Sequence, residues 1–478
     1  MSASSKSFAA AAFGLAALAA AAGPGVTVLH AFDYDDGQYP EGRLLYGRDG
    51  RLYGTTYAGG SRHLGTVFAV STRKVHAVLH SFDGRDGNSL DAGLVQRVDG
   101  SLFGTTPQGS ISLGGVSTNF GGTAFTLAPD GSGFATLRRF AGNGLPDGGM
   151  PGTLVDGGDG YFYGAARSGG SHGVGSVFKL APDGALGTLT AIDPASGSYP
   201  GAMLTLGSDG RLYGSLQYGP GNDDNGALFR VGRDGALAIV HAFGGADGSA
   251  PSGALVESDG SFYGVTGGGG AAGRGTVFRM AADGTLETLH AFNGDDGASP
   301  VGPLARGADG TLYGLTFGGG AQGGGTIFRI TPDGAFMTLH RLVPADGTHP
   351  VAGPILGDDG LLYGAATQYG GAPGASGSVF QFDPLAPQPA ELDLSKHCYN
   401  EFNTCFKPIN TTVGVPYDVI WSSANLDACE ASGAWSGATA PAGRLHVTPL
   451  QRGVFTYRLR CTGPGGASRK ASITVTVG

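Results

Sequence analysis

One segment of this 478-residue chain carries hydrogen-bonding side chains that no other part of the sequence repeats. It reads YGPGNDDN, and two consecutive arginines stand earlier in the chain. Carboxylates, amides, guanidinium groups and a phenol together suit a polar ligand such as a glycan. Neutral drift of surface loops explains the same residues without a ligand. The candidate ligand-binding residues are Tyr218, Asn222, Asp223, Asp224, Asn225, Arg138 and Arg139.

Short acidic segments of the form [DN]-x-x-D-G offer a second kind of chemistry. Their side-chain oxygens are of the type that Ca²⁺ binds, and the glycine permits a tight turn. A complete calcium loop needs six to eight oxygens and a closing glutamate, which these segments lack at the expected distance. Turn-forming Asp and Asn explain the same pattern, so a cofactor-free protein and bound calcium both stay open. The candidate calcium ligands are Asp33, Asp36, Asp83, Asp86, Asn293 and Asp296.

Five histidines occupy one position of a recurring L-H-x-F motif. A residue repeated from unit to unit usually satisfies a repeated hydrogen bond. Catalysis instead needs one asymmetric constellation. We therefore expect a structural role for these histidines, which are His30, His80, His241, His290 and His340.

The elements that position these side chains come from an internal repeat. The motif D-G-x-[LF]-[YF]-G occurs seven times, and each copy is followed by G-[TSA]-x-F and preceded by a clear or degraded L-H-x-F. The first motif begins at residues 49, 99, 159, 209, 259, 309 and 359, and the second begins at residues 65, 122, 175, 226, 275, 325 and 377. Fixed order in seven copies excludes composition bias as the cause.

Each repeat divides into four strand-sized pieces joined by tight turns. In the first copy, "GRLLYG" and "RLYGTTY" flank an Asp-Gly turn, and "GTVFAV" and "VHAVLHSF" flank another. Four-stranded units of about 50 residues in series predict a β-propeller, here with seven blades over residues 26–384. The high glycine content, 92 residues, disfavours long helices. The expected fold class is therefore all-β.

The phase of the repeat predicts how the ring closes. The N-terminal strand Val26–Phe32 is a spare fourth strand, and the last repeat stops after its third strand at Ser378–Phe382. Pairing the two removes two exposed edges.

The connections between the second and third strands, and between consecutive repeats, emerge on one face and vary most. We expect any binding site on that face.

The motifs "DGRLYGTT", "GTVFAV" and "VLHSF" resemble the GloVer tandem repeat of exported bacterial proteins. The resemblance covers about Val26 to Pro384. It implies a propeller and export, and it supplies no set of catalytic residues.

The N-terminus is typical of a secretory signal peptide over residues 1–22. Lys6 precedes an apolar run from Phe8 to Ala22 that ends in an A-x-A-like cleavage site. The run is too short to span a bilayer comfortably, and the alternative is an uncleaved anchor. The sequence thus predicts a monomer without a membrane span, secreted or at the cell surface. The net charge of −9 argues against a nucleic-acid partner.

The character of the chain changes after the repeats. Residues 385–392 are expected to form a linker, and residues 393–478 alternate like the strands of a small Ig-like β-sandwich. All four cysteines lie there, and in an exported protein they should be oxidised. Three pairings are possible, of which we favour Cys398–Cys405 and Cys429–Cys461. A zinc site is the alternative, but the spacing matches no zinc motif.

The function that these features favour is non-catalytic binding of extracellular polysaccharide or cell-surface glycan. A polysaccharide lyase or glycoside hydrolase at the propeller mouth is the first alternative, and a structural or adhesion protein is the second. No nucleophile, zinc-protease or phosphate-binding motif occurs, so no catalytic residue is assigned. Unrepeated acidic, basic and aromatic residues converging in one pocket would favour the enzyme, whereas a sevenfold-similar mouth would favour binding.

Overall fold

The computed structural model describes residues 25–478 except 114–115, 143–144, 146, 222, 372–373, 386–390, 398–408, 412–416, 425–427, 435–436, 440–442, 463–467 and 478. Every regular element in the described part of the chain is a β-strand, so the all-β prediction is confirmed. Within the same residues, no helix is long and apolar enough to cross a membrane. The predicted signal peptide lies outside the described residues.

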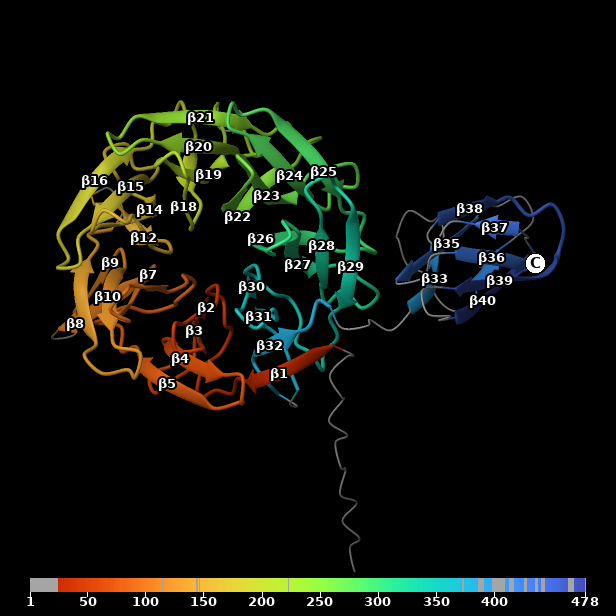
Figure 1. Cartoon of the computed structure of the whole chain (residues 1–478), viewed down its shortest axis with the longest axis horizontal. Coiled ribbons are helices and arrows are strands. Elements are labelled where there is room, and N and C mark those ends of the chain that lie inside the picture. Colours follow the sequence, from red (N-terminus) through yellow and green to blue (C-terminus); the bar gives the residue numbers. More distant parts are fainter. Residues whose placement is uncertain are drawn as a thin grey trace, which may run out of the picture.

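Seven consecutive sheets are arranged around a ring, as in a β-propeller (Figure 1). Each sheet is antiparallel, and in the first six sheets chain order runs from the inner to the outer strand, whereas the outer strand of the last sheet is β1. The sheets are β2-β3-β4-β5, β6-β7-β10-β11, β12-β14-β15-β16 with β13, β17-β19-β20-β21 with β18, β22-β23-β24-β25, β26-β27-β28-β29 and β30-β31-β32-β1.

The strands of the ring follow the predicted repeat closely. Their bounds are β1 Val26–Ala31, β2 Leu45–Tyr46, β3 Arg51–Thr56, β4 Thr66–Ser71, β5 His76–Ser81, β6 Val95–Gln96, β7 Leu102–Thr106, β10 Thr123–Leu127, β11 Ala135–Arg139, β12 Gly149–Pro151, β13 Val155–Asp156, β14 Phe162–Ser168, β15 Ser176–Leu180, β16 Leu186–Ala191, β17 Ser198–Pro200, β18 Thr205–Leu206, β19 Leu212–Tyr218, β20 Ala227–Val231, β21 Leu237–Ala242, β22 Ser249–Ser258, β23 Ser261–Gly268, β24 Thr276–Ala281, β25 Leu286–Ala291, β26 Ala298–Arg306, β27 Leu312–Gly318, β28 Thr326–Ile330, β29 Phe336–Arg341, β30 Ile355–Leu356, β31 Leu362–Ala366 and β32 Ser378–Phe382.

The ring closes through its first strand. β1 pairs antiparallel with β32, with Val26 opposite Phe382 and Ala31 opposite Ser378. The predicted closure is therefore confirmed. It places the outer strand of the last sheet at the start of the chain, so the two ends of the ring hold each other.

The repeated motif stabilises its own hairpin turn. Asp49 Oδ1 accepts the N–H of Arg51, which closes the turn, and Asp49 Oδ2 accepts the hydroxyl of Tyr53 at 2.7 Å. The core lies between neighbouring sheets, where Phe68 of β4 and Phe32 pack with Tyr363 of β31. Aspartate, glycine and tyrosine thus recur because each sheet needs the same turn and the same packing.

Most of the ten extra residues of the second repeat belong to a separate hairpin. β8 (Gly109–Leu113) pairs with β9 (Val116–Phe120) in the connection between β7 and β10. The second and third copies of the first motif are 60 residues apart and the other copies 50, and this hairpin accounts for most of the difference.

The C-terminal part contains two further sheets, β33-β35-β38 and β34-β40-β39-β36-β37. The predicted Cys429–Cys461 disulfide joins paired positions of β36 and β39, whereas Cys398 and Cys405 lie outside the described residues. The domain boundaries at 384 and 393 stay predictions, since residues 386–390 are among those not described. The bounds are β33 Glu391–His397, β34 Ile409–Thr411, β35 Tyr417–Ala424, β36 Ala428–Gly433, β37 Gly437–Thr439, β38 Gly443–Val447, β39 Gly453–Thr462 and β40 Ser468–Val477.

Candidate functional site

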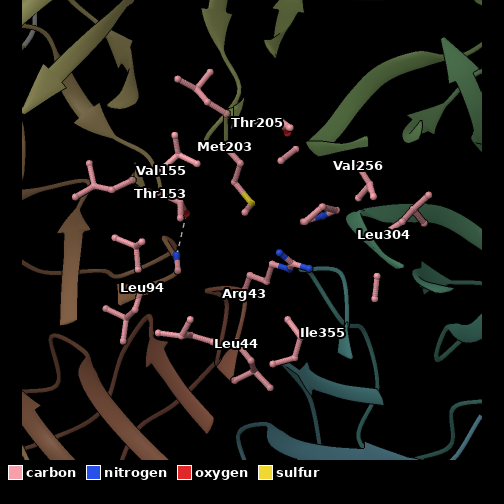
Figure 2. A pocket seen from close by; sticks show the side chains of 18 of the residues that line it. Arg43, Leu44, Leu94, Thr153, Val155, Met203, Thr205, Val256, Leu304 and Ile355 are labelled. Atoms are coloured by element: carbon pink, nitrogen blue, oxygen red, sulfur yellow. Dashed lines mark hydrogen bonds between the residues drawn. The ribbon is translucent and has the colours of Figure 1, made fainter. Parts of the chain in front are cut away.

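The segments that lead into the innermost strands converge at the axis of the ring, and one of them carries an arginine. Arg43 stands immediately before the repeated leucine of the first sheet. Figure 2 shows its guanidinium group reaching between the segments of other sheets, near Met203 and Ile355. The residues at the equivalent position are Gly93, Thr153, Met203, Ala254, Pro303 and Pro354.

The environment of Arg43 leaves part of its hydrogen-bonding capacity unused. Its Nη2 donates to the carbonyl oxygen of Pro354 at 3.1 Å, while its buried Nε has no hydrogen-bond partner. Burial lowers the pKa of Arg43 to about 10, so the group stays charged at neutral pH. Arg43 borders two cavities along the axis, of about 690 and 570 Å³. An unpaired cation thus lies between them.

The smaller cavity collects unrepeated polar side chains. Glu41 and Asp91 enter from the segments before β2 and β6, and Arg167 and Gln217 enter from the ends of β14 and β19. Tyr199 contributes an aromatic ring at the same cavity. These segments belong to the connections on which the sequence predicts a binding site. We call this cavity of about 570 Å³ the axial pocket.

The two carboxyl groups of the axial pocket differ in electrostatic environment. Arg167 Nη1 lies 3.7 Å from Asp91 Oδ2. Burial raises the pKa of Asp91, and the charge of Arg167 opposes this rise. Burial, together with the nearby charge of Asp91, raises the pKa of Glu41 to about 7. Near neutral pH, Glu41 is therefore able to donate a proton.

The axial pocket is not sevenfold symmetric. In the first repeat Glu41 follows Pro40, and in the second repeat Asp91 follows Leu90, which stands in the place of that proline. The other five repeats have no acidic residue at this position. The equivalent residues of the other repeats are Gly152, Gly201, Ser252, Val301 and Val351. By the criterion drawn from the sequence, this unrepeated constellation of acidic, basic and aromatic residues favours an enzyme, and the mouth is not sevenfold similar. An alignment of the seven repeats, column by column, reveals it.

The predicted fourth-repeat loop lies beside the axial pocket rather than in its lining. Asp223 Oδ1 accepts the backbone N–H and the side-chain amide of Asn225, at 3.0 and 2.7 Å. Tyr218 makes an edge contact with Tyr199, with ring centroids 5.7 Å apart. Asp224 is exposed, and Asn222 lies outside the described residues. The loop therefore contacts the lining of the axial pocket through the rings of Tyr218 and Tyr199.

The two predicted arginines lie on β11, the outermost strand of its sheet. Arg138 takes the place of the repeated histidine and forms an ion pair with Asp147. Arg139 donates to the carbonyl of Arg85 at 3.2 Å and lies over the ring of Phe120. The structure thus does not bring them to the axial pocket.

The repeated histidines form hydrogen bonds with the acidic connections. His30 Nε2 lies 2.7 Å from Asp36 Oδ2, and Asp36 Oδ1 accepts the backbone N–H of Asp33. Equivalent pairs recur in four further sheets, so the structural role predicted for the histidines is confirmed. The other pairs are His80–Asp86, His241–Asp247, His290–Asp296 and His340–Asp346.

The other candidate calcium ligands are used in the same way. Asp86 Oδ1 accepts the N–H of Asp83, and Asp296 Oδ1 accepts that of Asn293. Oxygens proposed as calcium ligands therefore accept hydrogen bonds from the protein itself, as turn-forming residues do. Calcium binding stays a hypothesis.

Comparisons with known proteins agree with this architecture. The family model of the Gloeobacter/Verrucomicrobia repeat matches residues 9–117, 109–257 and 221–393. No curated protein sequence matches the chain. The extracellular domain of the hybrid two-component system BT3049 from B. thetaiotaomicron has a similar fold, with a TM-score of 0.51, 11% identity, and coverage of 95% of this chain and 57% of that one.

Two further solved structures are similar at lower scores. The extracellular domain of BT4673 from the same organism has a TM-score of 0.48 and 9% identity over 92% of this chain and 56% of that chain. The α-L-arabinanase of Penicillium chrysogenum has a TM-score of 0.40 and 12% identity over 76% of this chain and 98% of that chain. The chain spans little more than half the length of the two B. thetaiotaomicron structures.

Proposed function

Since the chain belongs to the Gloeobacter/Verrucomicrobia repeat family, whose repeats here form the ring and its axis, we propose that it is an exported protein that binds extracellular carbohydrate in the axial pocket. The observation that carries this proposal is the meeting of Glu41, Asp91 and Arg167 in one cavity. The signal-peptide pattern of residues 1–22 supports export.

The side chains of the axial pocket suit a sugar. Carboxylates, a guanidinium group and the amide of Gln217 accept and donate hydrogen bonds in pairs, which matches vicinal hydroxyl groups. Tyr199, 46% exposed, offers an aromatic surface to the apolar face of a sugar ring. Arg43 and Arg167 add positive charge, so a glycan with carboxylate groups should bind better than a neutral one.

Hydrolysis of a glycosidic bond is the second candidate function, and it is favoured by the unrepeated residues of the axial pocket and by the pKa of Glu41. Glycoside hydrolases use one carboxyl group as a proton donor and a second as an ionised nucleophile or base. Glu41, whose pKa is raised to about 7, suits the first role, and Asp91, beside Arg167, suits the second. In that case the pocket both binds and cleaves its ligand.

One pair of assays separates these functions. The purified full chain is screened on a glycan array and, in parallel, incubated with the polysaccharides it binds while new reducing ends are measured. Binding that is weakened at least about tenfold in Arg167→Ala supports the pocket as the binding site, since a charged hydrogen bond contributes about 1.5–3 kcal/mol. Reducing ends produced by the wild type and lost in Glu41→Gln indicate hydrolysis. Unchanged binding in Arg167→Ala and Glu41→Gln would contradict the proposal.

A further inference from the structure

One histidine on the outer face of the ring breaks the pattern of the repeat. His76, the first residue of β5, stacks flat on His30 of β1, with ring centroids 3.7 Å apart and an interplanar angle of 3°. In two other sheets a phenylalanine stacks in the same way on the repeated histidine. Phe134 covers His80 at 3.6 Å, and Phe336 covers His290 at 3.6 Å.

The equivalent positions of the remaining repeats are aliphatic, and they are Val26, Leu186, Leu237 and Leu286. Stacking therefore requires an apolar or aromatic group and not an imidazole. His76 adds two ring nitrogens to a place where the fold needs none.

These nitrogens complete a set of three donor residues. The ligand atoms of His30, Asp36 and His76 all lie within 4.8 Å of one another. His76 Nδ1 is 3.8 Å from Asp36 Oδ2, the same oxygen that His30 Nε2 approaches to 2.7 Å. The buried Nε2 of His76 has no hydrogen-bond partner. A buried polar atom without a partner costs stability, unless a ligand satisfies it.

A backbone donor also fixes the carboxylate of this set. The backbone N–H of Asp33 orients the carboxylate from behind.

We propose that His30, Asp36 and His76 bind one divalent transition-metal ion of the zinc type. Two imidazoles and one carboxylate form a donor set that suits Zn²⁺ and leaves a fourth position for water. The ligand atoms of a tetrahedral zinc ion lie about 3.3–3.5 Å apart, so side-chain rotations that move the donor atoms by about 1–1.5 Å suffice. The side chains are 16, 23 and 12% exposed, so an ion has access from solvent.

The ion would join the ring-closing strand to its neighbour. His30 belongs to β1 and His76 to β5, so a metal bond between them ties the N-terminal strand to the first sheet. Because an ion bound only by the folded state stabilises it, metal should raise the melting temperature. The site lies on outer strands and does not depend on the proposed carbohydrate binding.

The repeat itself supplies matched variants for the test. His76→Phe recreates the Phe134–His80 stack and should fold while losing the site. Phe134→His places the same three donors around His80 and Asp86 and should create a second site. Full-length chains freed of metal are titrated with Zn²⁺ against a chromogenic chelator, and their melting curves are recorded.

We expect His76→Phe to bind one zinc ion fewer than the wild type, and Phe134→His to bind one more. Zinc should raise the melting temperature of the wild type by a few degrees more than that of His76→Phe. Equal zinc stoichiometry in all three chains would overturn the proposal. If His76→Phe fails to fold, His76→Leu, which copies Leu186, replaces it, and the gain in Phe134→His remains an independent measurement.

Discussion

A Cβ atom on Gly54 would lie 2.4 Å from Cζ of Phe68, its cross-strand partner on β4. The last glycine of D-G-x-[LF]-[YF]-G and the phenylalanine of G-[TSA]-x-F thus form one packing unit, because the ring of the phenylalanine lies over the glycine. The same relationship holds in all seven sheets, at 2.2–2.6 Å. The other pairs are Gly104–Phe125, Gly164–Phe178, Gly214–Phe229, Gly264–Phe278, Gly314–Phe328 and Gly364–Phe380.

Gly54→Ala should therefore destabilise the ring. The added methyl group meets a fully buried aromatic ring, and overpacking of this kind costs about 1–3 kcal/mol. Urea denaturation measures the loss as a lower transition midpoint. Gly187→Ala on β16 is the control, since its Cβ would lie 3.4 Å from the flexible side chain of Lys179 and should change stability little. Equal midpoints for both variants would refute the packing unit.

The sequence predicts features that repeat better than features that occur once. Seven copies of a motif reveal strands, turns and closure together, and the pairing of Val26 with Phe382 follows from the phase of the repeat. The sequence did not predict the axial pocket, because Glu41, Asp91 and Arg167 come from three repeats and meet only at the centre of the ring. Each looks like an isolated surface charge until the repeats are aligned in register.

Glu41 should make stability depend on pH. Its carboxyl keeps a proton in the folded protein up to about pH 7, but loses it near pH 4.5 when unfolded. The folded state therefore binds more protons in this window, and stability falls as the pH rises through it. Glu41→Gln cannot ionise, so its melting temperature should rise relative to the wild type between about pH 5 and pH 8.

Melting curves at several pH values check this expectation. Glu287→Gln on β25 serves as the control, because Glu287 is 60% exposed in its ion pair with Arg279. A difference between Glu41→Gln and the wild type that stays constant with pH would show that Glu41 is not protonated in the pocket.

The charge of Arg43 should lower the stability of the folded chain and favour the binding of an acidic glycan. A buried cation without an ion pair is costly, and the fourth repeat carries Met203 at the same position. Arg43→Met should raise the unfolding free energy by on the order of 1–3 kcal/mol and weaken binding of an acidic glycan. Denaturation and titration calorimetry measure the two effects. Lower stability together with full affinity would indicate that Arg43 is a structural residue.

Removal of β1 should open the ring. Without Val26–Phe32, the third strand of the last sheet exposes the backbone groups that now pair with β1. An unpaired edge of this kind promotes association between chains. Light scattering should therefore show aggregates, and the melting temperature should fall relative to a chain that begins at Gly25. A monomeric truncated chain with unchanged melting would contradict the role of β1 in closure.

The fourth-repeat loop provides the test that separates its binding role from that of the axial pocket. Asp223 and Asp224 are exposed, and the hydrogen bonds that Asp223 Oδ1 accepts both come from Asn225. Replacing both with Ala should change stability by no more than about 0.5 kcal/mol. If the loop extends the site past Tyr199, affinity should fall by about 1.5–3 kcal/mol per lost charged hydrogen bond.

The affinity of this double variant is measured by calorimetry beside that of Arg167→Ala, and the comparison shows which region binds the ligand. A loss confined to Arg167→Ala would assign the ligand to the pocket alone and identify the loop as drift, whereas a large stability loss in the double variant would indicate that the loop carboxylates have a structural or calcium-binding role.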